Sequence, residues 1–182
     1  LLLIFDFGFG IFEGDFENDA IGKSGKFTWS DGTNYQGDLD KGIFNGRGIL
    51  IDPKKGKYEG EFQNGIFHGK GKFTWFDSNY NDSNETYDGE YFDGKKNGFG
   101  IYTFSDKSRI EGYFESGELQ GECTYYKDGY KYTGEFAHGE LEDEMQVEED
   151  ENTDKQGEQI DNFDFKLQQE NIDIEKLSDV NK

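Results

Sequence analysis

Apolar and polar side chains alternate along most of this chain, and glycines interrupt the alternation at regular places. In residues 58–62, two aromatic side chains and a central glycine share one face of an extended strand, while two glutamates point to the other face. Asn64 and Gly65 follow as a pair that tolerates positive φ at a chain reversal. Residues 69–75 then alternate again as the returning strand. This pattern predicts a β-hairpin with an aromatic face and a charged face.

The hairpin pattern recurs six times along the chain. The segments begin 23, 23, 29, 23 and 22 residues apart, at Phe12, Tyr35, Tyr58, Tyr87, Ile110 and Tyr132. A repeat this short predicts an array in which each hairpin packs against its neighbours. The third position of every segment is a glycine, which we expect to leave room for a neighbouring ring: Gly14, Gly37, Gly60, Gly89, Gly112 and Gly134.

Composition indicates how such an array buries a core. Only 32% of the residues are hydrophobic, but 17% are aromatic, and one ring covers roughly 150 to 250 Å². Rings stacked over glycines therefore replace a two-layer core. The inward rings of the returning strands could line a ligand groove, but packing is the simpler interpretation because the sheet has no other core. These rings are Trp29, Phe73, Trp75, Tyr102 and Phe104.

The segments resemble the MORN (membrane occupation and recognition nexus) repeats, whose pattern is approximately Y-x-G-E-[WF]-x-x-G-x-x-x-G-x-G. Residues 58–71 match this pattern almost completely, with Gly60, Gly65, Gly69 and Gly71 in place. The resemblance covers about residues 12–139. It implies an all-β fold, an elongated single-layer antiparallel β-sheet solenoid of hairpins. Roughly twelve strands spaced about 4.8 Å apart would give a rod about 50 to 60 Å long.

The ends of the array depart from the pattern. Asp19 stands where a turn glycine belongs in the first segment, Cys123 replaces a glycine in the fifth, and the sixth is expected to stop after its first strand. Such departures are typical of degenerate or capping repeats. Residues 1–11 contain an apolar run too short for a transmembrane helix, and we interpret them as the remnant of a preceding strand pair.

Charge separates the array from the C-terminal part of the chain. The formal charge is −21, and residues 140–182 hold 16 acids and four lysines, which leaves −9 on residues 1–139. We expect residues 140–182 to form an acidic tail that is largely disordered or partly helical. An amphipathic helix over 160–177 could dock into a partner's groove, with a solvated tail as the alternative. Its apolar stripe would contain Phe163, Leu167, Ile174 and Leu177.

The acidic balance narrows the classes of partner. A negative surface repels nucleic-acid backbones and anionic lipids, so we expect no nucleic-acid partner and consider a membrane lipid disfavoured. The single cysteine excludes an internal disulfide framework and favours a reducing, cytoplasmic compartment. Other proteins of a large assembly, or a second copy of this chain, are the partners that remain.

Motifs for catalysis and metal binding are weak. Residues 22–24 resemble the end of a phosphate-binding P-loop, but an earlier glycine is missing. His68 and His138 stand beside turn glycines without a sequence-evident nucleophile. The residues from Asp77 to Asp88 have the spacing of a calcium loop without its glycine, and a six-residue insertion in the third repeat, able to act as a recognition loop, is the simpler interpretation. We therefore predict no enzyme activity, no cofactor and no metal site.

The outward positions of the strands hold the candidate partner-binding residues. In the first three repeats, acids such as Glu13 and Glu59 can lie across from bases such as Lys26 and Lys72. In the fourth and fifth repeats the outward positions become apolar, and an exposed apolar cluster indicates a protein contact. The alternative is that a bulge reverses the alternation and buries these residues. The cluster comprises Phe99, Ile101 and Tyr113.

Three functional interpretations follow. The resemblance to MORN proteins implies a non-enzymatic structural scaffold in a cytoskeletal or ciliary (axonemal) assembly, such as a radial spoke head. The first alternative is a membrane-associated adaptor that binds phosphoinositide lipids, and the second is the regulatory repeat array of a larger enzyme. The lipid surface would be a group of lysines: Lys23, Lys26, Lys54, Lys55 and Lys57.

Overall fold

The computed structural model describes residues 3–6, 10–17, 20–77 and 82–149, and within them it contains strands and no helix. The described part of the chain is therefore all-β, as predicted. The strands are β1 (Leu3–Asp6), β2 (Gly10–Glu17), β3 (Ala20–Trp29), β4 (Asn34–Asp40), β5 (Ile43–Asp52), β6 (Gly56–Gln63), β7 (Ile66–Phe76), β8 (Asp82–Phe92), β9 (Lys95–Thr103), β10 (Arg109–Glu115), β11 (Glu118–Lys127), β12 (Tyr130–Ala137), β13 (Glu140–Leu141) and β14 (Gln146–Glu149).

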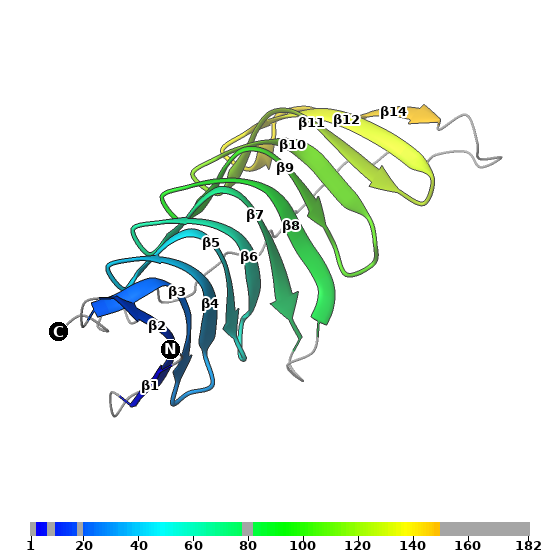
Figure 1. The fold of residues 1–182 in the computed structure, drawn as a ribbon. Coiled ribbons are helices and arrows are strands. Elements are labelled where there is room, and N and C mark those ends of the chain that lie inside the picture. The colour runs from blue at the N-terminus through cyan, green and yellow to red at the C-terminus, as the bar shows by residue number, and fades with distance from the viewer. Residues whose placement is uncertain (1–2, 7–9, 18–19, 78–81, 150–182) are drawn as a thin grey trace.

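The strands form one open antiparallel sheet in which β1 to β13 follow one another in chain order. β14 also pairs with β12, beyond the end of β13. Figure 1 shows the strands bowed in the same sense, so that successive hairpins line up as arches of one long trough. The predicted single-layer antiparallel array is confirmed.

A row of glycines crosses the sheet at right angles to its strands. It contains all six glycines predicted at the third position of a segment. The close approach of backbones requires glycine here, because a Cβ added to Gly37 would lie 2.4 Å from the Cα of Gly48. In order across the sheet the row is Gly14, Gly25, Gly37, Gly48, Gly60, Gly71, Gly89, Gly100 and Gly112, followed by Cys123 and Gly134.

Beside the glycine row runs a row of buried, mostly aromatic side chains that leans over it. The ring of Tyr58 covers Gly60 and Gly71, and its hydroxyl donates a hydrogen bond of 2.8 Å to the carbonyl oxygen of Glu61. Two or more residues from each hairpin enter this core, including the rings predicted to pack inward. The buried row is Phe12, Phe27, Tyr35, Leu50, Tyr58, Phe73, Tyr87, Tyr102, Ile110, Tyr125 and Tyr132.

At one edge of the sheet, two-residue turns close the hairpins. Asn64 and Gly65 have φ angles of +52° and +84°, which is the geometry that the sequence pattern predicted. The N–H of Gly65 donates a hydrogen bond of 2.9 Å to the carbonyl of Phe44, and the N–H of Gly94 bonds Phe67 in the same way at 3.0 Å. Each turn is thereby tied to the hairpin before it.

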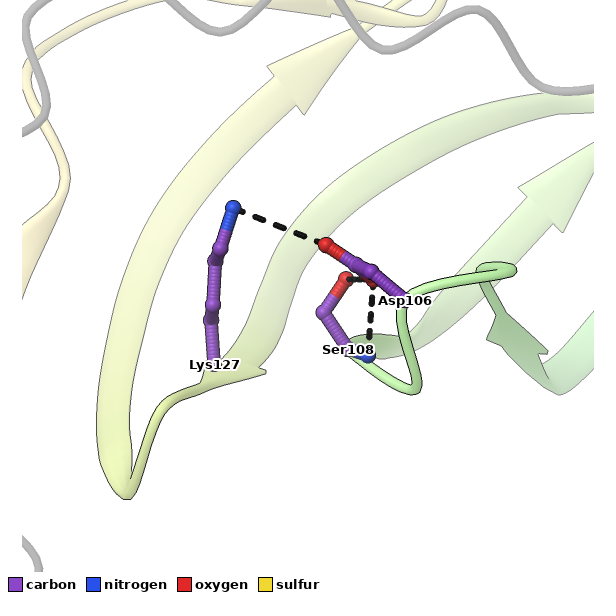
Figure 2. Close-up of polar contacts among 3 residues, drawn as sticks. All are labelled: Asp106, Ser108 and Lys127. Atoms are coloured by element: carbon purple, nitrogen blue, oxygen red, sulfur yellow. Dashed lines mark hydrogen bonds and ion pairs between the residues drawn. The ribbon is translucent and has the colours of Figure 1, made fainter.

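At the opposite edge, short loops join one hairpin to the next, and an aspartate organises several of them. In the loop between β9 and β10, the carboxylate of Asp106 accepts hydrogen bonds from the N–H of Ser108 at 2.9 Å and from its hydroxyl at 2.5 Å (Figure 2). The same carboxylate lies 3.6 Å from Nζ of Lys127, the last residue of β11, next to the turn that leads to β12. These contacts fasten neighbouring loops to each other.

The C-terminal end differs from the prediction. The sixth segment does not stop after its first strand, because the chain reverses after β12 and pairs again as β13 and β14. Leu141 and the buried Met145 cover Gly134, where a ring lies in the first four repeats. The sheet therefore runs to Glu149, ten residues past the predicted end at 139. The helix expected over 160–177 lies outside the described residues.

At the N-terminal end, one strand precedes the first repeat. β1 pairs antiparallel with β2, so the sheet begins before the first repeat. Asp19 lies outside the described residues. Asp82 to Thr86, which are part of the stretch that contains the insertion in the third repeat, lie in strand β8.

Candidate functional site

The outer face of the sheet, opposite the buried rings, is charged over the first three hairpins. Glu13 pairs in register with Lys26, and Glu59 pairs with Lys72, so the predicted placement of acids across from bases is confirmed for these residues. Opposite charges on directly facing strand positions stabilise a sheet, by about 0.2–1 kcal/mol per pair. This part of the outer face is therefore a balanced, solvated surface.

The fourth and fifth hairpins interrupt that charge pattern with an apolar cluster. Phe99 on β9 and Tyr113 on β10 are directly opposite each other, with ring centroids 5.7 Å apart and an edge-to-face angle of 72°. Their exposed fractions are 44% and 62%. Ile101 is partly exposed and lies in register between Asp88 and Glu111. The structure thus places all three residues, the outer apolar cluster, on the outer face; their role in partner binding stays a prediction.

Comparison of equivalent positions shows what Tyr113 replaces. In five of the six segments the residue after the row glycine is an acid, and only the fifth has tyrosine. The acid has a local role: the carboxylate of Asp38 accepts a hydrogen bond of 2.9 Å from the backbone N–H of Arg47, beside the left-handed Gly46. Tyr113 has no carboxylate with which to make that contact. Sequence reasoning missed this role of the acid, although its recurrence at one position of the repeat was the available signal.

The strands that follow the apolar cluster are acidic on the outer face. Glu122 on β11 and Glu135 on β12 are directly opposite each other, and both are exposed. Like charges at facing positions destabilise a sheet. The nearby base Arg109 lies over the ring of Tyr126 at 4.0 Å and donates a hydrogen bond of 2.7 Å to Glu111.

The inner face contains a residue that sequence reasoning missed. Lys96 is fully buried, and its Nζ lies 5.2, 5.5 and 5.6 Å from the ring centroids of Trp75, Tyr87 and Tyr102. In the second hairpin the same position holds Phe44, which stacks on the ring of its own repeat at 3.6 Å. A lysine at an apolar position of the repeat was the available signal. The cation here takes the place of a stacked ring.

The remaining candidate groups have ordinary surroundings. Burial raises the pKa of the Cys123 thiol to about 11, so the thiol is protonated at neutral pH. The His68 ring lies beside that of Phe92, with centroids 5.3 Å apart, and His138 occupies a turn with φ +52°. No cluster of three or more His, Cys, Asp or Glu side chains able to hold a metal occurs among the described residues. The tail residues Phe163, Leu167, Ile174 and Leu177 lie outside them.

Comparison with known protein families agrees with the register of the glycines and rings. Five stretches match the MORN repeat family, at residues 12–34, 35–57, 58–80, 87–109 and 111–129. Because these stretches make up more than half of the sequence, the chain belongs to the MORN repeat family. No curated protein matches the chain. The array is thus an interaction module of the MORN type. Within the described residues, no helix is long and apolar enough to cross a membrane.

Proposed function

We propose that this chain is a non-enzymatic scaffold that binds other proteins through the outer face of its repeat array. The observation that supports the proposal is the exposed pair of Phe99 and Tyr113, at a position where the two preceding hairpins carry opposite charges. Exposed aromatic side chains on a rigid surface are typical of the centre of a protein interface. The sheet holds the two rings at a fixed distance from every other hairpin.

The assembly that we propose is cytoskeletal and, more narrowly, ciliary or axonemal. Support comes from the MORN family resemblance, which includes radial spoke heads, and from the shape of the sheet. Thirteen strands in sequence order, spaced about 4.8 Å apart, give a strut about 60 Å long that can set a spacing between neighbours. The proposed location is the cytoplasm, at the cytoskeleton.

The lipid adaptor is less well supported. Lys26 lies in register between Glu13 and Gln36, and Nζ of Lys57 is 2.8 Å from the carboxylate of Glu59. These lysines therefore do not form a free basic surface that would attract anionic headgroups. Lys54 and Lys55 remain on the loop between β5 and β6.

Detergent extraction of cells that express a tagged chain tests the proposal. A scaffold is expected to stay with the insoluble cytoskeletal or axonemal fraction after the membranes have been dissolved. Release together with the lipids would favour the membrane adaptor. Recovery in the soluble fraction before detergent is added would contradict both functions.

The variant carrying Phe99→Ser and Ile101→Ser serves as the matched test of the surface. It is expected to reduce retention and to leave the thermal melt, followed by circular dichroism, unchanged. A large loss of stability would instead assign these side chains to the core.

A further inference from the structure

One register position on the outer face can be compared across consecutive hairpins. At this position β5 pairs with β6, β7 with β8, β9 with β10, and β11 with β12. Because the backbone geometry is the same each time, differences between the pairs reflect side-chain choice alone. The four pairs are Arg47 with Glu61, Lys70 with Glu90, Phe99 with Tyr113, and Glu122 with Glu135.

In the first two of these pairs a base faces an acid, whereas the equivalent pair between β3 and β4, Ser24 with Asp38, has no base. The third pair exposes two aromatic rings, and the fourth sets two carboxylates against each other. Both choices cost stability relative to the first two, because they expose apolar area or oppose like charges. Since the two costly pairs are adjacent, we infer that they share a binding role.

The carboxylates bracket the two rings on both sides. The carboxylate of Glu90 on β8 lies at Gly98, the residue before Phe99, because a Cβ added to Gly98 would come within 2.5 Å of it. On the other side, Glu122 and Glu135 follow on β11 and β12. Strands β8 and β11 are three strand spacings apart, which is about 14 Å. An extended segment advances about 6.6 Å between side chains that point to the same side, so three such side chains span this distance.

We propose that this surface, formed by Glu90, Phe99, Ile101, Tyr113, Glu122 and Glu135, binds an extended basic segment of a partner protein. The segment crosses the strands with an apolar side chain between the two rings and with Lys or Arg two residues before and two residues after it. The inference rests on the proposed function and deepens it, because it gives the chemistry of the partner. It follows from charge complementarity around an apolar centre.

Two other occupants fit the charges less well. Residues 150–182 of this chain hold ten acids and four lysines, so the acidic surface repels them. The same surface of a second copy would bring Glu122 and Glu135 against identical carboxylates. A basic segment instead offsets the charges that face each other across β11 and β12.

Isothermal titration of the full chain with synthetic peptides tests the inference. The probe is the nine-residue peptide Lys-Thr-Phe-Thr-Lys-Thr-Phe-Thr-Lys at low salt. The comparison peptides replace every Lys by Glu, or every Phe by Ser. We expect the basic aromatic peptide to bind and its affinity to fall with added salt. Failure of the wild-type chain to bind it at millimolar concentration, or equal binding of the Glu peptide, overturns the inference.

The repeat supplies matched variants. Phe99→Lys with Tyr113→Glu recreates the pair found at Lys70 and Glu90, so it is expected to keep the fold and to weaken peptide binding at least tenfold. Glu122→Lys recreates the same pair one hairpin later and is expected to weaken binding while the melting temperature stays equal or rises. Ile11→Thr, an exposed apolar position on β2, is the control and should leave binding unchanged. Equal binding by the double variant and the wild-type chain contradicts the inference.

Two further results would assign the surface to another occupant and so overturn the inference. One is a dimer in sedimentation of the chain alone that is lost in the double variant. The other is binding to phosphoinositide vesicles that the same double variant abolishes. Failure of the proposed function can be distinguished from failure of this inference. A chain that is released with the lipids, yet still binds the basic peptide through Phe99 and Tyr113, contradicts the scaffold function. It does not contradict the inferred chemistry of the partner.

Discussion

At the scale of single residues, the fold depends on the absence of a Cβ under each ring. A Cβ added to Gly60 would lie 2.5 Å from the Cα of Gly71 and 2.6 Å from the hydroxyl oxygen of Tyr58. Neither neighbour can move freely, since one is backbone and the other is a buried ring. Gly60→Val is therefore expected to lower the free energy of unfolding by about 3 kcal/mol or more, measured by urea denaturation followed by circular dichroism.

The control for this prediction lies in the same hairpin. Gly65 has φ +84°, and the nearest atom to an added Cβ is 3.8 Å away, so Gly65→Asn should change the free energy of unfolding by under about 1 kcal/mol. Equal effects of the two substitutions would contradict the register of Gly60 under Tyr58.

Lys96 gives a second prediction at this scale. Because ring faces attract cations and repel anions, Lys96→Glu would set a carboxylate among Trp75, Tyr87 and Tyr102 and should destabilise the protein by roughly 3 kcal/mol. The neighbouring Lys95 is exposed, and Lys95→Glu should have little effect. The comparison is a pair of thermal melts. A tolerated Lys96→Glu would show that the lysine does not depend on the rings.

At the scale of elements, the fifth hairpin packs its glycine row differently from the others, without a ring over the glycine. Ile110 stands where the other repeats mostly have tyrosine, and the Sγ of Cys123 lies 2.5 Å from where a Cβ of Gly112 would be. The shorter isoleucine leaves space that the cysteine fills. The two departures from the repeat pattern therefore form one compensating pair.

A double-mutant cycle tests this compensation. Cys123→Gly should open a cavity, and Ile110→Tyr should overpack against the thiol, each lowering the free energy of unfolding by about 1–3 kcal/mol. The double variant recreates the tyrosine-over-glycine arrangement of the second hairpin and should recover most of the loss. Additive losses in the urea midpoints would show that the two positions do not compensate each other.

The loop between β9 and β10 predicts a pH dependence. The hydrogen bonds from Ser108 hold the pKa of the Asp106 carboxyl below its ordinary value of 3.8. A carboxyl whose folded pKa is depressed stabilises the fold above its unfolded pKa, and this contribution disappears as the pH falls through the folded pKa. The melting temperature of Asp106→Ala should therefore lie slightly below that of the wild-type protein at pH 7 and approach it below pH 3.8. Asp106→Asn, which keeps an acceptor for the Ser108 N–H, should lie closer to the wild-type protein at pH 7 than Asp106→Ala does, with the same dependence on pH, because neither variant titrates at this position. A constant difference across this range would contradict the role of the carboxylate.

At the scale of the whole molecule, periodicity predicted most of the fold. The recurrence of glycine two residues after an aromatic residue gave the hairpins, their order and the buried face, because a repeat fixes neighbour contacts without long-range information. The predicted end of the array, at residue 139, was wrong. Met145 covers Gly134 from a segment that carries no repeat signal, so the sequence pattern could not place it.

The candidate site was predictable in position but not in detail. Strand parity placed Phe99 and Tyr113 on the outer face, and the structure exposes them there. Their direct pairing depends on the stagger between β9 and β10, which spacing alone does not determine. The facing of Glu122 and Glu135 depends in the same way on β11 and β12. The inference about the partner's chemistry therefore required the observed register between the strands, which the alternation of side chains along one strand does not give.

The order of the strands also determines how the array carries load. Along β1 to β13, each strand is held by the strands before and after it in the sequence, and the bonds between them run parallel to the long axis. Tension applied to the two ends of the array therefore detaches its outermost hairpins one after another, while the remaining hairpins keep their core. Each detached hairpin finds an intact edge on which to refold. Such an array yields stepwise when stretched, which would cap the force that the proposed scaffold passes between its partners.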